Sequence, residues 1–94
     1  MRSDDEVLTT LARIYTAREI ALDQNEELWA VQRDQTRDHR ITDAVLAELV
    51  ERGMVEVEDR PGGEVALNLT QRGFYYGGRE VEREFRAEKR RVRA

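Results

Sequence analysis

The sequence has no cysteine, one proline and one histidine among its 94 residues. Without cysteine, neither disulfide bonds nor thiolate metal sites can stabilise the fold. A metal ion at His39 would find only carboxylates as further ligands, so we expect no metal and no cofactor. A single histidine gives no basis for a Ser-His-Asp arrangement, and acidic pairs such as Asp4-Asp5 are typical of solvated surface. We therefore expect that the protein is not an enzyme.

Long apolar runs are absent as well. No stretch approaches the roughly 20 apolar residues that a membrane-spanning helix requires. The first residues, Met1 to Glu6, are acidic where a signal peptide would be basic and then apolar. These absences predict a cytoplasmic protein with no membrane partner. A chain of 94 residues can bury one core but not two independent ones, so we expect one small unit.

Acidic residues outnumber basic ones, giving a net charge of −4, but the charges are unevenly distributed. Met1 to Leu69 carries 8 arginines against 16 acidic residues, whereas Thr70 to Ala94 carries 8 basic residues against 4 glutamates. Binding to phosphate requires clustered arginine and lysine, so the acidic average argues against a nucleic-acid partner and the basic end argues for one. The run Lys89 to Arg93 is either such a contact or a solvated helix end, where cations are also favourable.

Several patterns in the first 40 residues predict helices. Ser3 to Glu6 has the form of a capping box, which marks a helix start. One face of the first helix would then carry Val7, Leu8, Leu11, Ala12, Ile14 and Tyr15. Thr16 to Glu19 repeats the capping signature and predicts a second helix, with a continuous helix as the alternative. We also predict a helix over Glu26 to Arg33. The pattern leaves open whether Ala17 to Leu22 or Glu26 to Arg33 is the second helix of a helix-turn-helix motif.

The strongest pattern in the chain runs from Ile41 to Leu69. Apolar residues follow helical spacing up to Gly53, then alternate with polar residues on both sides of Pro61-Gly62-Gly63. This order predicts a third helix, entered from Arg37 or Asp38, that leads directly into a β-hairpin. Its second strand would face inward with Val65, Leu67 and Leu69. Because a lone hairpin is marginal in water, it must pack on the helices.

Thr70 is predicted to cap a last helix that extends to about Arg91. Gly77-Gly78 costs about 2 kcal/mol of helix propensity relative to alanine, so the helix is broken there or the glycines let another backbone approach closely. Six residues of this helix are separated alternately by four and three positions, which is the spacing of a coiled-coil seam: Phe74, Gly78, Val81, Phe85, Glu88 and Val92. We expect residues 74–94 to be a dimerisation element with a basic end, with contacts from Phe74, Val81, Phe85 and Val92.

The segment from Ala47 to Glu56, AELVERGMVE, followed by LTQRG at Leu69 to Gly73, resembles a family pattern. That pattern is L-x-x-L-x-x-x-G-L-V followed by L-T-x-x-G, found in MarR-like and archaeal winged-helix regulators. Thr16 to Ala21 is similar to the second helix of many such proteins. The resemblance covers about Asp4 to Gly73. It implies a mainly α fold with a small β-hairpin, namely a winged helix-turn-helix over residues 1–73 in the order helix, helix, helix, strand, strand, helix, with a long C-terminal helix.

In that family the third helix enters the major groove of DNA and the wing tip touches the flanking backbone or the minor groove. The resemblance implies base-edge contacts from Arg40, Asp43, Ala44 and Ala47. It likewise implies phosphate contacts from Arg37 and His39 and a wing contact from Arg60, and Arg33 could also position the domain on phosphates. The sequence departs from the family because Asp43 and Glu48 lie near the groove-facing side, and Ile41 to Glu51 contains no lysine or arginine.

We expect, as the leading hypothesis, a transcriptional regulator that binds double-stranded DNA as a homodimer. The first alternative is a protein-interaction module whose acidic third helix and wing bind a basic partner. The second alternative is an architectural chromatin protein whose basic end binds DNA without sequence preference. The sequence specifies neither an operator nor an effector ligand.

Overall fold

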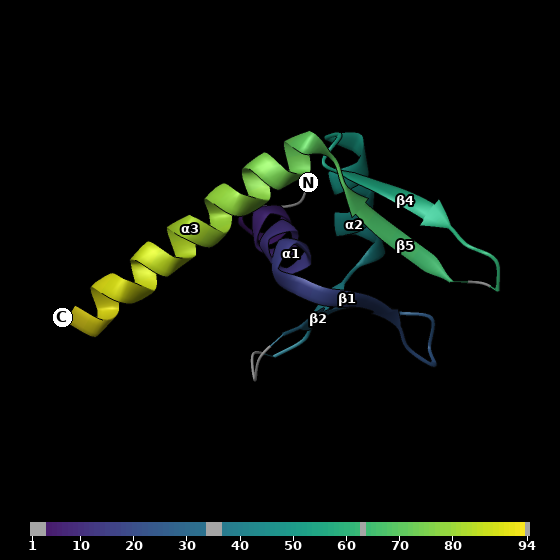
Figure 1. The fold of residues 1–94 in the computed structure, drawn as a ribbon, viewed down its shortest axis with the longest axis horizontal. Helices are drawn as coiled ribbons and strands as arrows, with labels where there is room; N and C mark the ends of the chain where they lie inside the picture. The colour runs from purple at the N-terminus through teal and green to yellow at the C-terminus, as the bar shows by residue number, and fades with distance from the viewer. Residues whose placement is uncertain (1–3, 34–36, 63, 94) are drawn as a thin grey trace.

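The computed structural model describes residues 4–33, 37–62 and 64–93, with side chains up to residue 90. Three helices and two antiparallel sheets form a small α+β unit (Figure 1). Their order is α1 (Asp4–Thr16), β1 (Ala17–Leu22), β2 (Leu28–Gln32), β3 (His39–Ile41), α2 (Asp43–Glu51), β4 (Val55–Asp59), β5 (Val65–Leu69) and α3 (Gln71–Arg93). Ser3 of the predicted capping box lies outside the described residues.

The prediction of a second helix is wrong at both candidate places. Ala17–Leu22 is strand β1, and the segment predicted as a helix over Glu26 to Arg33 contains strand β2. The two strands pair antiparallel, with Ile20 opposite Ala30 and Leu22 opposite Leu28, and β3 pairs with β2 in the same sheet. A continuous helix through Thr16 is also wrong, because α1 ends there. A three-stranded sheet therefore occupies the place of the expected second helix.

A tight turn between β1 and β2 explains this difference. The Asp23 carboxylate accepts hydrogen bonds from the backbone N–H groups of Asn25 at 2.8 Å and Glu27 at 2.9 Å. Its second oxygen accepts from Trp29 Nε1 at 2.9 Å, and Glu26 takes a positive φ of 60°. These bonds, that from Glu27 first, lower the pKa of Asp23 below its ordinary value. An aspartate that binds the backbone two and four residues ahead favours a turn over a helix.

The predicted helix followed by a hairpin is confirmed. Thr42 caps α2, with its Oγ1 accepting from the Val45 N–H at 3.3 Å, and Gly53 adopts φ +72° just beyond the helix end. Strands β4 and β5 pair antiparallel from Val55 opposite Leu69 to Asp59 opposite Val65. The predicted entry at Arg37 or Asp38 is wrong, because the chain first forms β3 against β2 and α2 begins only at Asp43.

The core lies where α1, the three-stranded sheet, α2 and the hairpin meet. Its buried members are Val7, Leu11, Ile14, Ala30, Ile41, Val45, Leu49, Met54 and Val55. The predicted apolar face of α1 is largely confirmed, since four of its six residues are buried, but Leu8 is only half-buried and Tyr15 is exposed. On β5, Leu67 and Leu69 pack against the core as predicted. Both sheets are therefore tied to the same interior as α2.

Helix α3 is continuous, so of the two alternatives at Gly77-Gly78 the helix break does not occur. The close approach there is made by a side chain, because a Cβ at Gly77 would lie 3.2 Å from the Tyr15 Cβ. Thr70 caps the helix as predicted, since its Oγ1 accepts from the Gly73 N–H at 3.0 Å and donates to Gly53 O at 2.6 Å. In the described part of the chain, no helix combines the length and hydropathy that a membrane crossing requires.

Figure 1 shows α3 lying across α1, with its C-terminal half projecting beyond the other elements. The projection makes the molecule elongated, with extents of 49 × 28 × 24 Å. Most residues of this half of α3, from Glu82 to Arg90, are exposed.

Candidate nucleic-acid interface

Helix α2 has a buried side and an open side. Val45 and Leu49 enter the core, while Asp43, Ala47, Val50 and Glu51 are exposed and Ala44 is half-buried. Of the four residues that the resemblance assigned to base edges, Asp43 and Ala47 therefore lie on the open side. This side carries no positive charge.

Arg40, the remaining candidate for a base-edge contact, lies outside α2. It sits in β3 opposite Trp29, and its guanidinium forms an ion pair with Glu27 at 3.0 Å. The turn at Asp23 places Glu27 at the start of β2, which brings its carboxylate within reach. An exposed ion pair of this kind contributes at most about 1 kcal/mol, so a phosphate could still compete for Arg40.

His39, for which the resemblance implies a phosphate contact, is half-buried against α1. Its Nε2 is hydrogen bonded to Thr10 Oγ1 at 3.0 Å, and Thr10 is buried. Burial lowers the pKa of His39 below its ordinary 6.5, the positive charge of Arg13 lowers it further, and Glu6 opposes the shift. The imidazole is therefore mostly neutral near pH 7 and half-buried, which makes it a poor phosphate contact.

The lowered pKa of His39 predicts how stability depends on pH. As the pH falls below 6.5, the imidazole takes up a proton in the unfolded chain before it does so in the folded chain. The contribution of His39 to the free energy of unfolding should therefore be fully present above pH 6.5 and be lost as the pH falls towards the folded-state pKa. His39 is the only histidine, so one imidazole resonance reports its titration by NMR. In urea unfolding between about pH 5.5 and 7.5, His39→Gln should flatten this dependence. A folded-state midpoint at or above 6.5 would contradict the prediction.

The four arginines expected to hold phosphate do not share one surface. Arg33 and Arg37 flank the connection from β2 to β3 and are exposed. Arg60 lines a cleft that runs along β1 from Ala17 to Leu22, at the sheet edge opposite β3. The two ends of a five-residue strand are on the order of 15 Å apart. Arg40, in β3, lies near the end of the sheet away from Arg33 and Arg37 and at the edge opposite β1, so the four arginines are spread around the sheet.

Negative charge dominates α2 and the hairpin. Residues 41–69 contain seven acidic residues and two arginines. Arg52 is engaged by Glu48 at 3.0 Å and Asp4 at 2.7 Å, and Arg60 lies 4.0 Å from Glu58. This face therefore repels phosphate unless another part of the molecule supplies the attraction.

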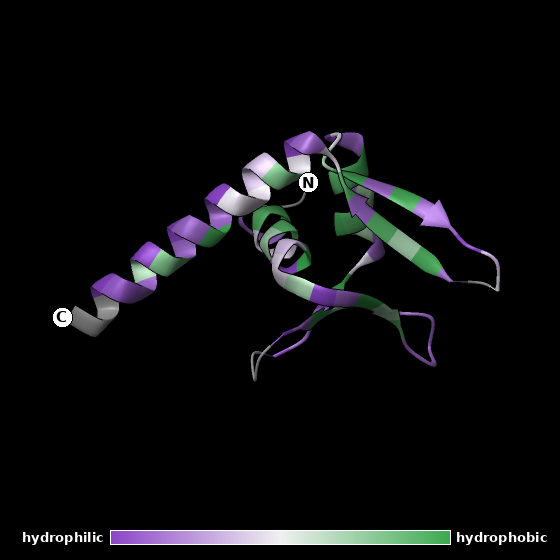
Figure 2. Cartoon of the chain, in the orientation of Figure 1, coloured by the Kyte–Doolittle hydropathy of each residue, from purple (hydrophilic) through white to green (hydrophobic). Residues whose placement is uncertain are grey.

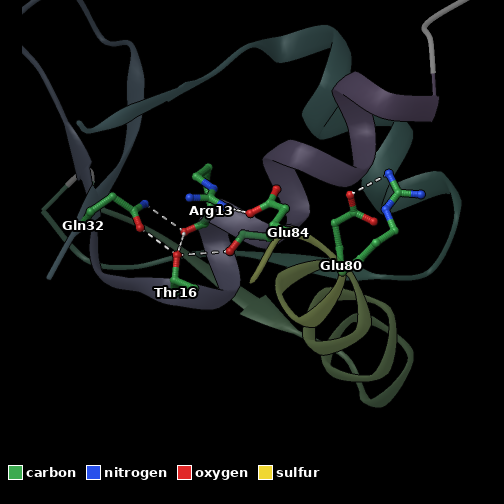
Figure 3. A network of polar contacts seen from close by, with 7 residues as sticks. Arg13, Thr16, Gln32, Glu80 and Glu84 are labelled. Carbon is green, nitrogen blue, oxygen red and sulfur yellow. Dashed lines mark hydrogen bonds and ion pairs between the residues drawn. The ribbon is translucent and has the colours of Figure 1, made fainter. Parts of the chain in front are cut away.

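A polar cluster between α1, the sheet and α3 was not predicted from the sequence (Figure 3). Arg13 forms an ion pair with Glu84, and Gln32 donates through Nε2 to Arg13 O at 3.0 Å while its Oε1 accepts from the Thr16 hydroxyl at 2.6 Å. Gln32 and Glu80 are buried. The cluster fixes where α3 crosses α1. Its only sequence signal is a glutamine in an apolar strand, which is too common to be decisive.

The expected dimerisation seam on α3 is only partly covered. Phe74 and Phe85 have exposed fractions of 57% and 62%, and Val81 is half-buried. The Tyr15 ring packs edge-on against Phe74 with ring centroids 6.0 Å apart. The side chain of Val92 lies outside the described residues. Two exposed phenylalanines three turns apart on one helix face form an unusual apolar surface for a small monomer.

No protein-family model matches the chain, and no similar protein was found among curated proteins or solved structures. Its function must therefore be argued from its own residues.

Proposed function

We propose that this chain binds double-stranded DNA as a homodimer and acts as a transcriptional regulator of the winged-helix type. The observation that carries the proposal is the joined unit of α2 and the β4–β5 hairpin. Leu49, Met54 and Val55 anchor both elements in one core, and Thr42 and Gly53 define the two ends of the helix. The unit holds a short exposed helix beside a protruding hairpin, the two parts that a winged helix uses on DNA.

The three-stranded sheet takes the role of the missing second helix in this proposal. Strand β3 ends at the buried Ile41, and Thr42 immediately caps α2. The sheet therefore sets the direction in which α2 leaves the core. The chain needs no cofactor or catalytic group for this function.

The dimer would form through α3, where Phe74 and Phe85 are exposed beside Tyr15. A second copy of the same surface is the occupant that matches its apolar chemistry, because a twofold interface pairs a patch with itself. Dimerisation would also give two copies of α2, which a palindromic site can engage.

Binding to DNA should be strongly dependent on salt. Each arginine that contacts a phosphate contributes about −0.9 to the slope of log K against log salt, so several contacts per protomer should give a slope steeper than about −2. Fluorescence anisotropy with a labelled duplex of about 30 base pairs, titrated from low to moderate salt, measures this slope. A flat response, or no binding to any duplex at low salt, would refute the proposal.

A second candidate function is supported by the charge of α2 and the hairpin. Seven acidic residues against two arginines favour a basic protein partner over phosphate on that face. Co-purification from a native lysate, with and without nuclease, separates the two functions. Partners retained after nuclease treatment favour the protein-interaction module, whereas partners lost with the nucleic acid favour DNA binding.

A further inference from the structure

Five arginines form a straight row along α3. Arg72, Arg79, Arg83, Arg86 and Arg90 are spaced by seven, four, three and four residues and are all exposed. At 3.6 residues per turn they fall within an arc of about 60°, and the row is about 27 Å long at 1.5 Å per residue. We call these five residues the arginine row.

Most of the positive charge of the row is available to a ligand. Arg72 lies over the Tyr76 ring at 5.7 Å and Arg79 over the Tyr75 ring at 5.6 Å, contacts that hold a guanidinium in place without neutralising it. Arg86 pairs with the exposed Glu82 at 2.6 Å, an interaction that phosphate can replace. Arg83 is the exception, because it pairs at 3.1 Å with Glu80, which is buried.

The fold leaves the arginine row open. Helix α1 packs mainly on another side of α3, where Gly77 meets Tyr15 and Glu84 meets Arg13, and only Leu8 of α1 borders the row, in a shallow cleft with Arg79, Arg83, Arg86 and Arg90. The apolar residues Phe74, Val81 and Phe85 lie about 150° around the helix from the row. Figure 2 shows hydrophilic residues predominating where α3 projects beyond the rest of the fold. A dimer formed through the apolar side would keep one row facing outward on each protomer.

We propose that the arginine row is the surface that holds the DNA backbone, so that α3, rather than α2, supplies the main phosphate contacts. This inference rests on the proposed function, and it assigns the electrostatic attraction for DNA to residues outside the unit of α2 and the β4–β5 hairpin. Guanidinium groups bind phosphate oxygens through two parallel hydrogen bonds. A straight row of about 27 Å is long enough to cross a major groove of about 12 Å and reach phosphates on both sides.

The arrangement favours nucleic acid over an anionic membrane. A helix that lies in a membrane surface inserts its apolar side and keeps its basic residues at the edge of that side, near the headgroups. In α3 the apolar side and the arginine row point in nearly opposite directions, so inserting one would carry the other away from the lipid. Binding to the backbone of a duplex does not require the apolar side of α3 to face the same ligand as the arginine row.

The test compares two triple variants with equal loss of charge. Arg79→Gln/Arg86→Gln/Arg90→Gln removes three members of the row and spares Arg83, whose partner is buried. Arg33→Gln/Arg37→Gln/Arg40→Gln is the control outside α3. Glutamine has nearly the helix propensity of arginine, and circular dichroism and sedimentation check that fold and oligomeric state are unchanged. Both are titrated with salt on the same duplex of about 30 base pairs.

The row variant should lose about 2 to 3 units of the salt slope and bind on the order of 100-fold more weakly at 0.1 M salt. The inference is overturned if its slope matches that of the wild type or changes no more than that of the control, and the proposed function then still stands. Absence of duplex binding by the wild type overturns both. The wild type is also tested on vesicles with about one-third anionic phospholipid. If it binds the vesicles but no duplex, and the row variant does not bind the vesicles, the partner is a membrane and both the inference and the proposed function are overturned.

Discussion

Replacing Gly73 with alanine should lower the free energy of unfolding by about 3 kcal/mol. A Cβ at this position would lie 2.0 Å from the Met54 carbonyl oxygen, 3.0 Å from the Met54 carbonyl carbon and 3.2 Å from Leu69 Cδ2. The carbonyl has little room to move, because it accepts the Thr70 N–H at 3.0 Å. The first turn of α3 would therefore have to lift away from the start of the hairpin. The cost exceeds the roughly 1 kcal/mol that alanine gains over glycine in a helix.

Gly78→Ala is the matched control on the same helix. A Cβ there would meet the Tyr15 hydroxyl oxygen at 3.5 Å, an ordinary contact distance. The gain in helix propensity should then be retained, so this variant should be more stable by up to about 1 kcal/mol. Thermal unfolding measures both, since 1 kcal/mol shifts Tm by about 4 to 8 °C in a domain of this size. A Gly73→Ala protein as stable as the wild type would contradict the packing of α3 on Met54.

Phe85→Glu should convert the proposed dimer into a monomer. The Phe85 side chain is 62% exposed on the apolar side of α3, and in the proposed dimer it would be buried against the partner copy. Burying a carboxylate in an apolar interface costs several kcal/mol unless it finds a partner, which is enough to abolish a small interface. Sedimentation velocity at several protein concentrations should show a dimer for the wild type and a monomer for the variant.

Val57→Glu serves as the control for this substitution. Val57 has a comparable exposed fraction of 45% but lies on β4, away from α3. The control should remain dimeric. A wild type that is monomeric at all concentrations, or a Phe85→Glu protein that still dimerises, would show that another surface covers the phenylalanines.

The helix and hairpin were predictable because their signals are local. Gly53 at a positive φ ends α2, and Pro61-Gly62 lies in the turn between two alternating segments. Each signal acts within a few residues, so the sequence displays it directly. The position and cap of α3 were predictable at Thr70 for the same reason.

The three-stranded sheet was missed because two local signals conflicted. Thr16 to Glu19 has a capping pattern, but Thr16 ends α1, and its hydroxyl lies 3.2 Å from Ala12 O within that helix. The decisive signal was Asp23, whose bonds to Asn25, Glu27 and Trp29 build a turn that composition alone does not distinguish from a helix start. Strand pairing then overrode the helical spacing of Leu28 and Val31.

Exposure of the candidate arginines was predictable, but their partners were not. The ion pair of Arg40 with Glu27 depends on the turn, and the bond of His39 to Thr10 joins residues 29 apart. The arginine row could have been found from its spacing in the sequence. The row is less conspicuous than the run Lys89 to Arg93, because the basic residues of the run are neighbours in the sequence. The arginines of the row become neighbours only on one side of the folded helix.

The contact between α1 and α3 also determines the order in which these two helices can pack during synthesis. Arg13 and Glu84 are 71 residues apart, whereas the strands of both sheets pair with neighbours along the chain. At 5 to 20 residues per second, roughly 3 to 14 seconds pass between the emergence of α1 and that of the part of α3 that covers it. Until then Tyr15 lacks its contacts with Phe74 and Gly77 of α3. Helix α3 is therefore the last of the described elements to pack on α1.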